Sequence, residues 1–177
     1  RRASCCGPGV TVTAERSASV RLHTANADET ESAGGALAAV LGPGTVVGLA
    51  GPLGAGKTCF ARGIAARLGV DPTLIASPTF VYLVDYPGEG LVLHHADLYR
   101  LAEVPDDAAE AAYEGIGLSA AFAAGGITVV EWWDSYRGPR PETLVRVEFL
   151  IENAEHRQLT VVFEGSRPTA AELQTLS

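Results

Sequence analysis

The residues with the most specific chemistry form a glycine-rich segment that ends in a lysine and a threonine. Gly51, Gly56, Lys57 and Thr58 satisfy the pattern G-x-x-x-x-G-K-[ST], and Gly54 gives the backbone further room. Glycines let such a loop curl until successive N–H groups point at an anion. The lysine then reaches the β- and γ-phosphates of a nucleotide, and the threonine hydroxyl binds Mg²⁺. The segment therefore predicts a site for a nucleotide bound with magnesium.

The composition of the chain supports this prediction. Lys57 is the only lysine among the thirteen basic residues, and all the others are arginine. A compact ammonium reaches between phosphates, whereas the planar guanidinium of arginine does so poorly. Lysine thus occurs at the one place where its shape is needed.

Two acidic residues are candidates for the acid that a phosphate loop needs near its metal. Glu131 closes the apolar run over residues 127–131 and is the first candidate. Asp97 closes the apolar run over residues 91–96 and is the second. A structural role stays open for each, as a solvated strand end for Glu131 and as a helix N-cap for Asp97.

A phosphate loop must follow a strand and open a helix. Residues 45–50 form a continuously apolar run, which is typical of a buried strand in a parallel sheet. Residues 57–68 carry Phe60 and Ile64 on one helical stripe, and Gly69 ends the predicted helix. The order of strand, glycine loop and helix is therefore the one that phosphate binding requires.

Other predicted elements surround this unit. Asp28 is the expected N-cap of the first helix, and Glu31 completes its capping pattern. Pro87 to Gly90 are expected to turn a β-hairpin. Apolar spacing predicts a helix over 28–41, hairpin strands over 79–86 and 91–97, broken helix over 101–122, a strand over 127–132 and an antiparallel pair over 144–151 and 158–163.

Length, charge and cysteine content narrow the class of protein. The 177 residues predict one domain over 16–165, with a disordered tail over 1–15 and a second tail over 166–177. A net charge of -8 argues against direct wrapping of nucleic acid. The three cysteines lack a CxxC spacing, so we expect neither zinc nor disulfides, which favours the cytoplasm. No apolar run predicts a membrane span or a signal peptide.

Two pairs of neighbouring side chains have less specific interpretations. Trp132 and Trp133 cannot both face inward on a strand, so we expect one in the core and one exposed, where it could contact a partner. His94 and His95 also point to opposite faces of a strand and offer too few ligands for a metal site. Cys59 is expected to be buried as a small apolar side chain rather than reactive.

Four segments in this order resemble the bacterial TsaE (YjeE) family, the ATPase of tRNA threonylcarbamoyladenosine biosynthesis. They are Gly51-Pro-Leu-Gly-Ala-Gly-Lys-Thr58, Ser77-Pro-Thr-Phe80, His95-Ala-Asp-Leu-Tyr-Arg100 and Val130-Glu-Trp132. The resemblance runs from about residue 22 to residue 152. Three positions depart from the family pattern, namely Pro52, Cys59 and Ala96, and none supplies a side chain that phosphate binding needs.

The resemblance implies a fold and a set of site residues. The fold would be a P-loop NTPase α/β domain with a central mixed β-sheet flanked by helices. Glu131 would help Thr58 to hold Mg²⁺, Asp97 would act near the γ-phosphate or its attacking water, and Lys57 would keep its phosphate role. The expected ATP-binding set is Gly51, Gly54, Ala55, Gly56, Lys57, Thr58, Cys59, Ser77, Thr79 and Trp132, with Ser77 to Thr79 as a switch-like loop.

The resemblance also implies partners. Members of the family work with TsaD and TsaB, which modify the tRNA, so this chain would contact tRNA only indirectly. Its ATP hydrolysis would reset that complex. A small-molecule or nucleoside kinase stays open, although Arg137 and Arg140 do not make a dense arginine lid. A nucleotide-gated adaptor also stays open, whereas a regulatory GTPase is disfavoured because the Asn-Lys-x-Asp motif is absent from the sequence.

Overall fold

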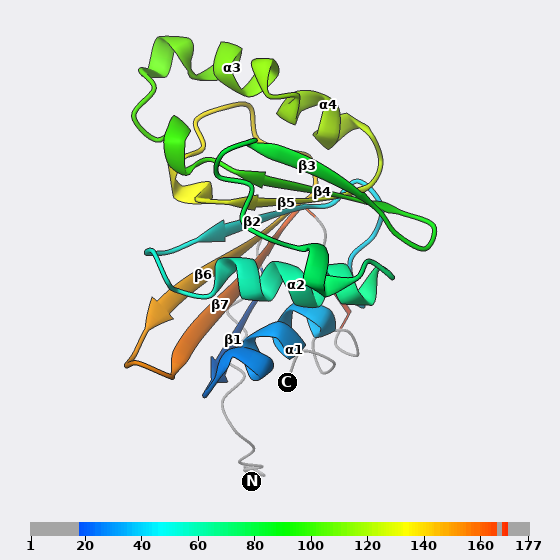
Figure 1. Ribbon diagram of the computed structural model, residues 1–177, viewed down its shortest axis with the longest axis vertical. Coiled ribbons are helices and arrows are strands. Elements are labelled where there is room, and N and C mark those ends of the chain that lie inside the picture. Colours follow the sequence, from blue (N-terminus) through cyan, green and yellow to red (C-terminus); the bar gives the residue numbers. More distant parts are fainter. Residues whose placement is uncertain (1–17, 166–167, 170–177) are drawn as a thin grey trace, which may run out of the picture.

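The computed structural model describes residues 18–165 and 168–169. The predicted tail over 1–15 lies outside the described residues, as does most of the predicted tail over 166–177. Within the described part, the chain forms one seven-stranded mixed sheet with helices on both of its faces (Figure 1).

The sheet has parallel strands at its centre and antiparallel strands at both edges. Its order is β1-β7-β6-β2-β5-β4-β3. β2 lies between β6 and β5 and is parallel to both, and β4 runs parallel to β5. The strands are β1 (Ala18–Thr24), β2 (Val46–Ala50), β3 (Leu83–Pro87), β4 (Val92–Asp97), β5 (Ile127–Glu131), β6 (Leu144–Ile151) and β7 (Arg157–Glu164).

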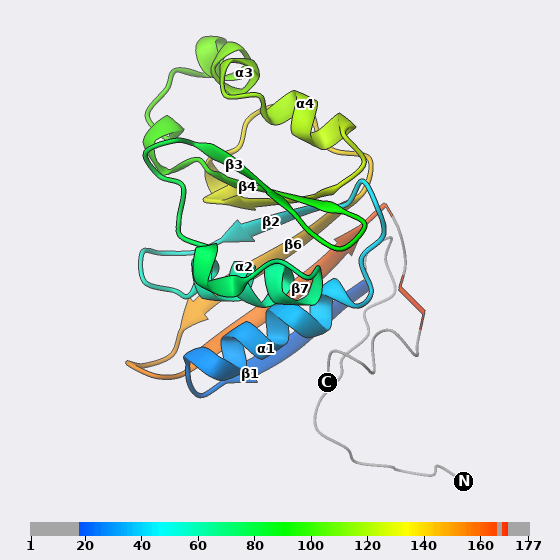
Figure 2. The same ribbon diagram turned by 45° about the vertical axis from the view of Figure 1, so that its right-hand side comes forward.

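The helices divide between the two faces of the sheet. Figures 1 and 2 show α1 (Ala27–Ala38) and α2 (Lys57–Arg67) on one face, and α3 (Asp106–Gly115) and α4 (Leu118–Ala123) on the other. Each pair covers its own apolar core, which explains why β2 and β5 are apolar at almost every position. Three short 3-10 turns complete the fold: η1 (Pro72–Leu74), η2 (Tyr99–Leu101) and η3 (Trp133–Ser135).

Helices α1 and α2 approach each other more closely than side chains would permit. A Cβ atom added at Gly63 would lie 1.7 Å from the carbonyl oxygen of Glu31, and one at Gly34 would lie 2.1 Å from that of Phe60. Only glycine fits at these contacts. The close contact fixes α2 against α1, so that the first turn of α2 has a defined position at the edge of the sheet.

The parallel strands also bring the two acidic residues together. Glu131 ends β5 and pairs in register with Leu49 of β2 on one side and with Asp97 of β4 on the other. The carboxyl ends of parallel strands meet at one edge of a sheet, where α/β proteins bind their ligands. Two acids separated by 34 residues in sequence thus lie beside the loop that leaves β2.

Most of the predicted elements are confirmed. The strand before the glycine loop, the helix after it, the hairpin of β3 and β4, the break between α3 and α4 and the antiparallel pair of β6 and β7 all form. β1, which no prediction included, pairs with β7 at the edge of the sheet. Residues 79–82 were expected in a strand, but they turn instead, with Tyr82 at a φ of 66°.

The expected cap of the first helix was wrong by two residues. Asn26 is the N-cap, and its Oδ1 accepts the backbone N–H of Glu29 at 2.8 Å. Glu29 also holds the chain before the helix, because its Oε2 accepts the N–H of Ala25, the residue before the cap, at 2.8 Å. Asp28, the residue predicted for the cap, lies in the first turn of the helix. Asparagine and aspartate are both favoured at the N-cap, so residue type alone could not distinguish Asn26 from Asp28. The helix begins after Asn26, the earlier of the two.

Candidate nucleotide site

The loop between β2 and α2 has the backbone of an anion cradle. Gly51, Gly54 and Gly56 have φ values of 142°, 75° and 102°, a region that disfavours other residues. A Cβ at Gly51 would also lie 2.9 Å from the carbonyl oxygen of Phe149. Gly56 precedes the first residue of α2, so the loop leads directly into the positive end of that helix. This geometry explains why the sequence requires glycine at these positions.

Lys57 occupies the centre of the cradle and is only 5% exposed. Its Nζ donates to the carbonyl oxygens of Gly51 at 2.7 Å and Pro52 at 2.9 Å. The same atom lies 3.9 Å from the centroid of the Trp132 ring, which is a cation–π contact. Burial lowers the pKa of Lys57 from its ordinary value, and the nearby carboxylates, Glu131 first, oppose this shift.

Glu131 is held by two side chains from different elements. Its Oε1 accepts the hydroxyl of Thr58, in the first turn of α2, at 2.8 Å. The same oxygen lies 3.0 Å from Nε2 of His95 on β4. Glu131 is 3% exposed, so the alternative of a solvated strand end is excluded. The structure thus brings Thr58 and Glu131 together, as their predicted shared role requires.

Asp97 is held by the loop that precedes β3. Its Oδ2 accepts the hydroxyls of Ser77 and of Thr79, the latter at 2.7 Å. Its Oδ1 accepts the backbone N–H of Tyr99 at 2.8 Å, which supports the 3-10 turn after β4. The N-cap of that turn is Leu98 rather than Asp97, so one oxygen of the carboxylate only supports the turn, while the other oxygen faces the Ser77–Thr79 loop.

The two tryptophans leave β5 in different directions. Trp133 is 9% exposed, and its ring lies against Gly48, where an added Cβ would meet it at 2.4 Å. Trp132 has a φ of 61° and lies between Lys57 and Tyr99, whose ring centroid is 4.9 Å away. The expectation of one core residue is confirmed for Trp133. Trp132 is half-buried against Lys57 rather than exposed.

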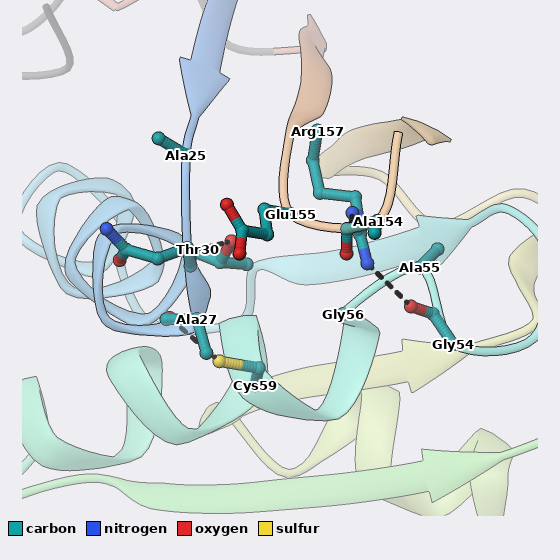
Figure 3. A pocket seen from close by; sticks show the side chains of 11 residues that line it. Ala25, Ala27, Thr30, Gly54, Ala55, Gly56, Cys59, Ala154, Glu155 and Arg157 are labelled. Carbon is teal, nitrogen blue, oxygen red and sulfur yellow. Dashed lines mark hydrogen bonds between the residues drawn. The ribbon is translucent and has the colours of Figure 1, made fainter. Parts of the chain in front are cut away.

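A cavity of about 520 Å³ lies beside the phosphate loop (Figure 3). Arg157, at the start of β7, reaches across it, and its Nη2 lies 3.4 Å from the carbonyl oxygen of Gly54. Cys59 is half-buried rather than buried as expected; its Sγ donates to the carbonyl oxygen of Ala27 at 3.1 Å, and partial burial raises the pKa of this thiol. The walls are formed by Ala25, Asn26, Ala27, Thr30, Gly54, Ala55, Gly56, Cys59, Ala154, Glu155 and Arg157.

Sequence reasoning missed several of these wall residues. Asn26, Thr30, Glu155 and Arg157 come from the turn before α1, from α1 itself and from the β6–β7 turn with the start of β7. They meet only because β1 and β7 pair at one edge of the sheet. The capping signal at Asn26 was available in the sequence, whereas nothing local pointed to Arg157.

A family model for "Threonylcarbamoyl adenosine biosynthesis protein TsaE" matches residues 24–159. The chain belongs to the TsaE family. Two relatives carry the name "tRNA threonylcarbamoyladenosine biosynthesis protein TsaE". The one from Treponema pallidum is 35% identical, over 80% of this chain and 99% of its own length. The one from Bacillus subtilis is 31% identical, over 84% and 88%.

A solved structure agrees with this assignment. The crystal structure of YdiB from Bacillus subtilis is 25% identical and superposes with a TM-score of 0.65, covering 92% of this chain and 94% of its own. The predicted family and its P-loop α/β fold with a mixed sheet are therefore confirmed. Family membership connects the chain to the biosynthesis of threonylcarbamoyladenosine in tRNA.

In this TsaE-family protein, the residues present suit a magnesium ion next to phosphates. The hydroxyl of Thr58 and the carboxylate of Glu131 are 2.8 Å apart, and both offer the oxygen ligands that Mg²⁺ prefers. Mg²⁺ keeps several waters and needs few protein ligands. Within residues 18–165, no group of three or more histidine, cysteine or acidic side chains is arranged to hold a metal ion by itself.

The remaining candidate groups of the TsaE-family chain have structural partners. Arg137 Nε pairs with Asp106 at 2.9 Å, and Arg140 pairs with Glu164. These contacts tie both arginines to the protein rather than to a lid over the loop. Across the described part of the chain, no helix is long and apolar enough to cross a membrane.

Proposed function

We propose that this TsaE-family protein binds ATP with Mg²⁺ and hydrolyses it to drive or reset a TsaD–TsaB complex that makes the threonylcarbamoyladenosine at position 37 of tRNA. The observation that carries the proposal is the contact of 2.8 Å between Thr58 at the start of α2 and Glu131 at the end of β5. This contact supports a shared role for the two side chains as ligands of the metal at the mouth of the phosphate loop.

The phosphates would lie in the loop. The backbone N–H groups between Gly51 and Lys57, with the first turn of α2, would bind their oxygens. Lys57 now donates to two carbonyl oxygens, and it would transfer those hydrogen bonds to the β- and γ-phosphates. A charged phosphate is a better acceptor than a neutral carbonyl, which favours the exchange.

Hydrolysis would depend on the two carboxylates. Glu131 and Thr58 would hold Mg²⁺, which supplies charge that offsets the negative charge on the phosphates. Asp97 would orient the attacking water and accept its proton. The Ser77 and Thr79 hydroxyls, which now hold Asp97, belong to the loop that would respond to the nucleotide.

The nucleoside would occupy the neighbouring cavity. Gly54 and Gly56 line both the cradle and the cavity, so the two are continuous. A volume of about 520 Å³ lies within the range of small-ligand pockets. Arg157 and Glu155 would then contact the base or the sugar from the β6–β7 side.

The partner would contact the loops around the phosphate site. Four exposed apolar side chains sit on or beside the loops that carry site residues: Leu53, Phe80, Val81 and Tyr99. Exposed apolar and aromatic side chains are typical of protein contacts. The net charge of -8 favours an indirect role with tRNA, and the reducing compartment expected from the cysteines suits the cytoplasm.

The test is ATP hydrolysis by the purified protein, alone and with TsaD and TsaB from the same source. We expect a slow rate alone and strong stimulation by the partners. The matched control is Lys57→Ala, which should show no stimulation. If the partners change nothing and a metabolite screen yields a phosphorylated product, the protein is a kinase. Assembly that depends on ATP binding without turnover would make it an adaptor.

A further inference from the structure

His95 is a buried polar residue in direct contact with the proposed metal ligand. It is 0% exposed, on β4, two residues before Asp97. Its strand register places it opposite Val129, two residues before Glu131 on β5. Side chains two residues apart share a face of a strand, so His95, Asp97 and Glu131 all point toward the side of the sheet that α2 covers.

The chemistry of the contact fixes which atom donates. A carboxylate has only acceptors, so Nε2 of His95 must carry a proton to bond Oε1 of Glu131 at 3.0 Å. Nδ1 of His95 is buried without a hydrogen-bond partner among the described residues. The tautomer with a proton on Nε2 therefore fits this contact.

Thr58 and His95 both donate a hydrogen bond to the same oxygen of Glu131. Thr58 approaches Oε1 from α2, and His95 approaches it from β4. Two bonds from two elements restrict the rotation of the carboxylate. Burying a histidine with one unsatisfied nitrogen costs free energy that an apolar side chain would not cost. The neighbouring buried positions Leu93 and Ala96 do carry apolar side chains.

We propose that His95 is a positioning residue for the magnesium site. Its Nε2–H holds Oε1 of Glu131 beside Thr58, so that the carboxylate is oriented before the metal arrives. This inference rests on the proposed function, because it assigns Glu131 to the metal. Partners that orient a metal ligand in this way affect metal affinity rather than the phosphate contacts.

The neighbouring histidine provides a matched control. His94 lies on the opposite face of β4, and its Nδ1 bonds Asp85 at 2.7 Å. Asp85 is 59% exposed and lies on the edge strand β3, away from Glu131 in the sheet order. His94 is nearly as buried as His95, so replacing it tests the cost of losing a buried histidine without touching the metal ligand.

The experiment measures ATP affinity at a series of Mg²⁺ concentrations and again with a chelator. The variants are His95→Gln, His95→Asn, His95→Leu and His94→Leu. A glutamine amide places its N–H near the Nε2 position, whereas an asparagine amide ends near Nδ1 and cannot reach Glu131. The Gln and Asn variants are both polar, so their comparison decides the question even if the Leu variant fails to fold.

We expect the half-saturating Mg²⁺ concentration to rise about 10- to 100-fold in His95→Asn and His95→Leu. His95→Gln should stay near the parent, as should His94→Leu. Affinity for ATP in the chelator should change little in every folded variant. Equal Mg²⁺ requirements in His95→Asn and His95→Gln would overturn the inference, and so would an equal rise in His94→Leu. A parent protein that binds no ATP, or binds it without regard to Mg²⁺, would instead contradict the proposed function.

Discussion

Asp97 and Glu131 end adjacent parallel strands and pair in register, yet their surroundings differ. Glu131 is held from inside the protein, by a fully buried histidine and by the first turn of α2. Asp97 is held on one oxygen by hydroxyls of the loop before β3, where Ser77 is exposed. Equivalent positions on neighbouring strands can thus carry a carboxylate fixed by the core and a carboxylate that depends on a surface loop.

The difference suggests that the two carboxylates have different roles. A metal ligand benefits from a fixed orientation, because coordination geometry is demanding for Mg²⁺. A group that meets the attacking water benefits from a partner loop that can respond to the nucleotide. Four variants test this difference and the phosphate loop beside it, beginning with the largest expected effect.

Asp97→Asn should separate turnover from binding. The amide keeps the size of the side chain and can still accept the N–H of Tyr99, but it cannot take a proton from water. We expect ATP turnover with partners to fall by roughly 10²- to 10⁴-fold. ATP affinity, measured by calorimetry, should change little. Unchanged turnover would return Asp97 to a purely structural role.

Lys57→Ala should weaken ATP binding by roughly 30- to 150-fold, which corresponds to about 2 to 3 kcal/mol of charged hydrogen bonding. Arg67→Ala, at the exposed end of α2, is the control for loss of a positive charge.

Because burial lowers the pKa of Lys57, its ammonium loses its proton below the usual lysine range. ATP affinity of the parent should therefore fall as the pH rises toward that range, and that of Lys57→Ala should not. Equal ATP affinity in Lys57→Ala and the parent would contradict the phosphate role.

Glu131→Gln should raise the half-saturating Mg²⁺ concentration by roughly 10- to 100-fold while leaving ATP binding in chelator unchanged. The measurement is the Mg²⁺ titration already described for His95. A Mg²⁺ requirement that stays at the parent's value would break the comparison, because Glu131 would then serve something other than the metal.

Replacing Ser77 and Thr79 together by alanine should have the smallest effect. The change removes two hydrogen bonds from Asp97 and leaves Glu131 untouched. We expect turnover to fall by about tenfold, as for the loss of about 1.4 kcal/mol from the barrier, with no change in the Mg²⁺ requirement. A shifted Mg²⁺ requirement would show that the loop also supports the metal site.

The sequence alone was sufficient to predict those parts of the site that are continuous in the chain. The phosphate loop with its strand and helix depends on local glycine and apolar spacing, so it was predictable from residues 45–68. Both acids were found because each closes an apolar run. Local patterns also sufficed for the β3–β4 hairpin, although its first strand begins at Leu83 rather than residue 79, where the chain turns through Tyr82.

Contacts between distant segments could not be predicted. The bond between His95 and Glu131 joins residues 36 positions apart and exists because β4 and β5 are neighbours. The contact between Arg157 and Gly54, 103 positions apart, needs β6 to lie between β7 and β2 in the sheet. Nothing in a local pattern encodes the order of strands, which is set by packing of the whole sheet.

The lone lysine makes the phosphate site chemically addressable. The chain has one ε-amino group, and it lies beneath Trp132 in the cradle. A lowered pKa leaves more of this amine uncharged and nucleophilic at a given pH than an ordinary surface lysine would be. Because no other side chain in the chain carries an amine, an amine-acylating reagent that enters the cradle could label no other side chain, and protection of Lys57 by nucleotide would report occupancy of the site.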